Sequence, residues 1–113
     1  MIKDIKSKEI NDLFQGIINT IDLVFSNDFY TETNSLVNVK KIIGKWYQDF
    51  KKYNRLTTIK VKDLEFVDLE ITNFFDIYIT NEPMSHNYTE ILSHSISVLE
   101  KYWKDEMLNG GNK

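Results

Sequence analysis

Cysteine and alanine are both absent from this chain of 113 residues, and proline occurs only once. The absence of cysteine excludes disulfides, thiolate zinc sites and cysteine nucleophiles, and it is typical of proteins in a reducing compartment. Long apolar runs are also missing, because none approaches the length of a signal-peptide core or a membrane span. We therefore expect a cytoplasmic protein that does not enter a membrane.

Arginine is nearly absent as well, since Arg55 is outnumbered thirteen to one by lysine, while isoleucine and asparagine are abundant. AT-biased coding tends to produce this composition, so we expect the source to be a low-GC bacterium, one of its phages or a mobile element. The lack of alanine, the best helix former, means that any helix must gain more stability from packing than from propensity.

The chain has the length of one domain with a single modest core. Hydrophobic residues make up 42% of it and charged residues 27%, which are the proportions of a soluble globular protein. We therefore expect one helical domain that spans residues 1–113.

Apolar residues recur at helical spacing in four segments, at about 7–26, 35–54, 63–80 and 87–108. The segments between them are short, so sequential helices should be neighbours in space. The pattern predicts an all-α fold, a small antiparallel four-helix bundle. The basic second helix should then lie antiparallel beside the acidic third.

Several local signals bear on where these helices begin. Ser7 can cap the first helix, and Asn87 followed by Glu90 resembles a capping box for the fourth. Residues 56–62 are β-branched and alternate, so a short strand is conceivable there. We interpret them as an extended connection, because a lone strand has nothing to pair with. Residues 63–80 also have strand propensity, but a helical stripe fits them better than alternation does.

The predicted third helix is apolar on two sides. Its main stripe, which should face the core, consists of Leu64, Val67, Ile71, Phe74, Phe75 and Tyr78. Phe66, Leu69 and Ile77 fall nearly opposite that stripe. They form either a surface for a partner or for self-association, or a surface that the preceding connection covers through Leu56, Ile59 and Val61.

Acidic side chains border this second stripe, and they are Glu65, Asp68, Glu70 and Asp76. A partner site there would have an apolar centre and a negative rim, which favours a partner with a basic collar.

Charge is strongly segregated along the chain, although the total is only −3. Residues 36–62 hold eight basic residues and one acid, whereas residues 63–91 hold seven acids and no base. Five lysines of the second helix share the side opposite its apolar stripe and are candidate phosphate-binding residues: Lys40, Lys41, Lys45, Lys51 and Lys52. The sequence pI of about 5.3 favours a solvated face that the third helix partly neutralises.

Motifs for catalysis, metal binding and cofactor binding are missing. His86 and His94 lie on one helix face with Glu90 between them, but their separation of roughly 12 Å along the axis is too large for one ion. The ligands of a di-iron site project into the core of a helical bundle, whereas the carboxylates of the third helix flank its apolar stripes. Neither a Gly-x-Ser-x-Gly elbow nor a phosphate-cradling glycine loop is present. We therefore expect no enzymatic activity, no metal and no cofactor.

These observations favour a non-enzymatic cytoplasmic protein that regulates or inhibits a protein partner. Immunity proteins, phage-encoded inhibitors and accessory subunits include helical bundles of this size, and fold alone does not separate them. The alternative, from another class, is an accessory subunit that contacts nucleic acid through the lysine side of the second helix. A small hydrolase with an unfamiliar site is a third interpretation.

Overall fold

The computed structural model describes residues 2–26, 34–78 and 83–110. Within these ranges the chain forms four helices, which are α1 (Ile2–Ser26), α2 (Asn34–Tyr53), α3 (Val61–Tyr78) and α4 (Pro83–Gly110). None of the described residues is in a strand. The predicted all-α fold is confirmed, and so is the helical interpretation of the third segment.

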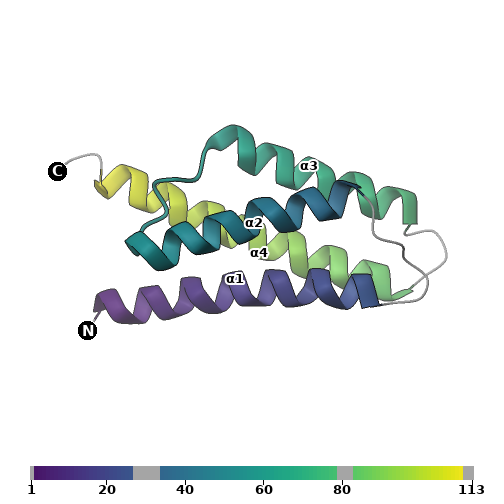
Figure 1. Cartoon of the computed structure of the whole chain (residues 1–113), viewed down its shortest axis with the longest axis horizontal. Helices are drawn as coiled ribbons and strands as arrows, with labels where there is room; N and C mark the ends of the chain where they lie inside the picture. The colour runs from purple at the N-terminus through teal and green to yellow at the C-terminus, as the bar shows by residue number, and fades with distance from the viewer. Residues whose placement is uncertain (1, 27–33, 79–82, 111–113) are drawn as a thin grey trace.

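The four helices run side by side in alternating directions and form an elongated bundle of 49 × 26 × 20 Å (Figure 1). Each helix packs against its neighbours in sequence, and α1 also packs against α4. The diagonal pairs, α1 with α3 and α2 with α4, make no close backbone contacts among the described residues. The bundle is therefore a closed ring in which α2 lies beside α3, as the short connections predict.

Each helix contributes one apolar stripe to a continuous core. Phe14 of α1, Ile43 of α2, Phe74 of α3 and Leu99 of α4 are among the side chains that are completely or almost completely buried. Such burial contributes about 1.5–3 kcal/mol per large apolar side chain, so packing compensates for the lack of alanine. Adjacent rings in α3 also meet edge to face, with the centroids of Phe74 and Phe75 5.1 Å apart.

Two tyrosine hydroxyls fix α1 against its neighbours. The Tyr47 hydroxyl on α2 donates to Oδ1 of Asn11 at 2.6 Å, and the Tyr102 hydroxyl on α4 donates to Oε2 of Glu9, also at 2.6 Å. The ring of Tyr47 stacks on Phe14 at a centroid distance of 5.3 Å. These directional contacts supplement the less specific apolar packing between α1 and its neighbours.

The connection at 54–60 folds back onto the end of the bundle. It begins at Asn54, whose φ of 54° is the left-handed conformation that ends a helix and that asparagine tolerates better than most residues. Leu56 and Ile59 are then buried in the core. The Leu56 amide donates to a carboxylate oxygen of Glu106 on α4. The connection is thus held in place without forming a strand.

The helix boundaries differ from the predicted ones in informative ways. α1 begins at Ile2, so Ser7 does not cap it and instead donates from Oγ to Oδ1 of Asn54 at 2.8 Å. α4 begins at Pro83, which places Asn87 inside the helix and rules out the predicted capping box. Proline is favoured in the first helical turn, where its missing N–H would have no intrahelical partner.

Candidate functional site

Among its described side chains, the outward surface of α3 carries two exposed apolar ones, Phe66 and Leu69. Phe66 is 36% exposed and Leu69 58% exposed, whereas Leu64 on the same helix is only 3% exposed. At 100° per residue, Leu69 lies nearly opposite the buried stripe of α3. Ile77, the third residue predicted for this surface, lies in α3, but its side chain is outside the part that the structure describes. Phe66 and Leu69 together are called the outer α3 surface below.

The preceding connection does not cover Leu69. Leu56 and Ile59 point into the core, and Val61 is itself 52% exposed at the start of α3. For Leu69, the structure therefore disfavours the second alternative that the sequence left open, coverage by the chain's own connection. Burying the rest of Leu69 against another molecule would contribute on the order of 1 kcal/mol.

The acidic residues near the outer α3 surface are distributed unevenly. Glu65, Asp68 and Asp76 are exposed, while Glu70 is half-buried. Glu65 and Asp68 line a shallow hollow of about 130 Å³ shared with Ile96, Ser97 and Glu100 of α4. The negative rim is therefore concentrated on the side of α3 that faces α4.

The lysine side of α2 is partly engaged within the protein. Lys40 forms an ion pair with Asp22 of α1, with 2.6 Å between Nζ and Oδ1. Lys51 lies over the ring of Tyr47, 4.5 Å from its centroid, and Lys52 lies 5.2 Å from that of Tyr53.

Lys41 and Lys45 are exposed, and neither belongs to an ion pair among the described residues. The ion pair that α2 forms among the described residues is thus with α1, while Asp63 of α3 lines a pocket together with Lys45. Lys40 is thus held by Asp22, and Lys51 and Lys52 lie over tyrosine rings, Lys51 more closely. Lys41, Lys45 and Lys52 are the lysines of this side that a phosphate would reach most readily.

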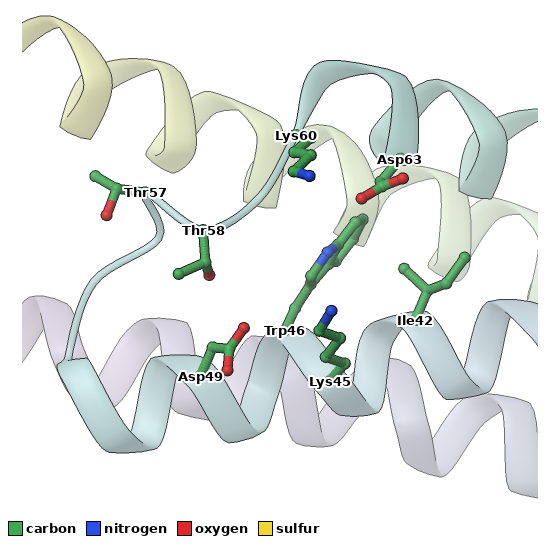
Figure 2. Close-up of a pocket in the computed structure, with 8 residues that line it drawn as sticks. All are labelled: Ile42, Lys45, Trp46, Asp49, Thr57, Thr58, Lys60 and Asp63. Carbon is green, nitrogen blue, oxygen red and sulfur yellow. The ribbon is translucent and has the colours of Figure 1, made fainter.

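A pocket of about 460 Å³ lies between α2 and the connection that leads into α3 (Figure 2). The sequence patterns did not predict it. Its residues from α2 are Ile42, Lys45, Trp46 and Asp49, and those from the connection and α3 are Thr57, Thr58, Lys60 and Asp63. The sequence feature that could have drawn attention to this pocket is Asp49, because it is the single acid within the basic segment 36–62. Its placement opposite Thr58 depends on the fold-back of the connection and does not follow from spacing.

Among the described residues, Tyr102 is the ionisable group whose pKa departs clearly from its ordinary value. The hydrogen bond to Glu9, followed by partial burial and by the negative charge of Glu9, raises the pKa of Tyr102 above that value. Tyr102 lies at the interface of α4 with α1, away from both the outer α3 surface and the pocket, so we assign it a structural role.

Within the described ranges no cluster of three metal-ligating side chains occurs, and His94 is an exposed residue of α4. The same ranges contain no helix that is long and apolar enough to cross a membrane.

Comparison with protein-family models, with curated proteins and with solved structures finds no match for this chain.

Proposed function

We propose that this chain is a non-enzymatic helical protein that binds a protein partner through the outer α3 surface and thereby regulates or inhibits that partner. The observation that supports the proposal most directly is the 58% exposure of Leu69, opposite the core. Phe66 extends the apolar surface by one helical turn. Exposed neighbouring apolar side chains bordered by charge are a common feature of protein-binding sites.

The charges around this surface indicate the chemistry that a partner should have. Glu65, Asp68 and Asp76 are exposed along α3, and no basic residue follows Lys62 in this helix. A partner with an apolar centre and a rim of lysine or arginine would match both features, and its association would be accelerated at low salt. A low-GC bacterial or phage inhibitor acting in the cytoplasm fits the composition.

Contact with nucleic acid through α2 is the weaker alternative. Phosphate binding requires free cations, and Lys40 and Lys51 already contact Asp22 and Tyr47. The outer α3 surface has no such internal partner for Leu69, so we favour the protein-binding function.

A comparison of two leucine substitutions tests the proposal. The tagged chain would be used to isolate a partner from the native host, and its affinity for the purified partner would then be measured by titration calorimetry. Leu69→Lys should weaken binding at least tenfold, because it places a charge in the interface and repels a basic rim.

Leu23→Lys is the matched control, since Leu23 is a similarly exposed leucine, at 54%, on α1. This variant should bind like the unmodified chain. Equal binding by both variants, or equal loss in both, would contradict the assignment of the site to α3.

A further inference from the structure

The pocket between α2 and the connection is separate from the outer α3 surface, because neither Phe66 nor Leu69 lines it. Figure 2 shows Trp46 rising from α2 toward the start of α3, with Asp49 further along the same helix. Trp46 is buried and Ile42 half-buried, so the two provide an apolar floor. A volume of about 460 Å³ lies within the range of pockets that bind small molecules.

The charged residues of the pocket are balanced but unpaired. Asp49 and Asp63 are half-buried, whereas Lys45 and Lys60 are exposed. None of these four residues belongs to an ion pair among the described residues, although all four line one pocket. Two carboxylates and two ammonium groups therefore line one pocket without forming a direct ion pair with each other.

We propose that this pocket binds a small zwitterion, specifically an α-amino acid with an apolar side chain. The ammonium group of the ligand lies toward the half-buried carboxylate of Asp49, which Figure 2 shows on the other side of Trp46 from Asp63. The carboxylate of the ligand faces Lys45 and Lys60 at the exposed edge. The apolar side chain packs on the floor formed by Trp46 and Ile42.

Charge balance distinguishes a zwitterion from a ligand with one charge. An anion alone would satisfy the lysines and meet two carboxylates without a counter-charge, and a cation alone would leave the lysines in the same position. A zwitterion offers a counter-charge to both kinds of charged group, and a charge that the ligand removes from water is favourable only when it is paired. The pocket should therefore discriminate against each analogue that lacks one of the two charges.

The test uses L-leucine as the probe, at concentrations up to the order of 10 mM, the range where weak small-ligand binding is detected. Binding to the unmodified chain would be measured by titration calorimetry. It would also be followed by Trp46 fluorescence in a Trp103→Phe background, where Trp46 is the one remaining tryptophan of the chain. The indole N–H of Trp103 is buried without a hydrogen-bond partner in the described structure, so phenylalanine at that position removes no hydrogen bond.

The expected result is saturable binding of L-leucine, with binding of 4-methylpentanoate and of 3-methylbutylamine weaker by at least tenfold. Asp49→Asn and Lys45→Gln should each weaken L-leucine binding at least fivefold. Lys52→Gln should leave it unchanged, because Lys52 is an exposed lysine of the same helix that does not line the pocket.

Three results would overturn the proposal: no binding of L-leucine, equal binding of the three probes, or equal effects of Lys45→Gln and Lys52→Gln. The partner-binding assay with Leu69→Lys is independent of these measurements. Failure of the pocket proposal would therefore leave the proposed function of the outer α3 surface standing, and the reverse also holds.

Discussion

Leu64 and Leu69 lie on the same helix and differ mainly in burial, which makes them a matched pair for a stability test. Alanine at either position removes the same side-chain carbons. Leu64 is 3% exposed, so Leu64→Ala should cost about 2–5 kcal/mol through lost burial and a residual cavity. Leu69 is 58% exposed, so Leu69→Ala should change the free energy of unfolding by no more than about 0.5 kcal/mol.

Urea denaturation and thermal melting, both followed by the helical circular dichroism signal, measure the two effects. At about 4–8 °C per kcal/mol for a small domain, Leu64→Ala should lower the Tm by roughly 10 °C or more and Leu69→Ala by only a few degrees. Phe74→Ala and Phe66→Ala provide a second pair, with Phe74 buried and Phe66 partly exposed. A loss of stability in Leu69→Ala as large as that in Leu64→Ala, independent of protein concentration, would refute the placement of Leu69 on an open surface.

Three further predictions follow from features of the helices. Gly16 and Gly44 lie inside α1 and α2 without positive φ, and an added methyl group would meet no atom within 4 Å at either position, so Gly16→Ala and Gly44→Ala should each raise the free energy of unfolding by up to about 1 kcal/mol in urea titrations. Because the pKa of Tyr102 is raised in the folded protein, its contribution to stability should be intact below about pH 10 and lost as the pH rises further, since the unfolded chain deprotonates first. Tyr102→Phe should remove that alkaline dependence, and Tyr53→Phe, at an exposed tyrosine, should retain it. If α2 binds DNA through Lys41, Lys45 and Lys52, a plot of log affinity against log salt should have a slope of about −3 at most, and a steeper slope would show that other cations contribute.

The helices could be predicted from sequence because burial imposes a period on it. The stripe from Leu64 to Phe75 is interrupted by charged residues at the intervals that a helix requires, so its core face was predictable without tertiary information. The position of Leu69 was predictable for the same reason, since it falls opposite that stripe.

The remaining features depend on contacts between segments far apart in the chain. Lys40 pairs with Asp22 across the interface of α1 and α2, and no sequence spacing specifies that contact. The pocket exists because Asn54 turns the chain back and Leu56 is then buried beside α4, which brings Thr58 over Asp49. The start of α4 at Pro83 could not be predicted from the sequence either, because proline is common both in turns and as the first residue of a helix.

The closed ring of helices places the start of α1 and the end of α4 at the same end of the bundle, on two antiparallel helices in contact (Figure 1). Pulling the two helices apart at that end applies the force perpendicular to the helix axes. Their contacts would then break one turn at a time, as in unzipping. The bundle should therefore unfold at low force when it is stretched through its termini, and at higher force when it is held at residues on opposite ends, where the same contacts must shear together.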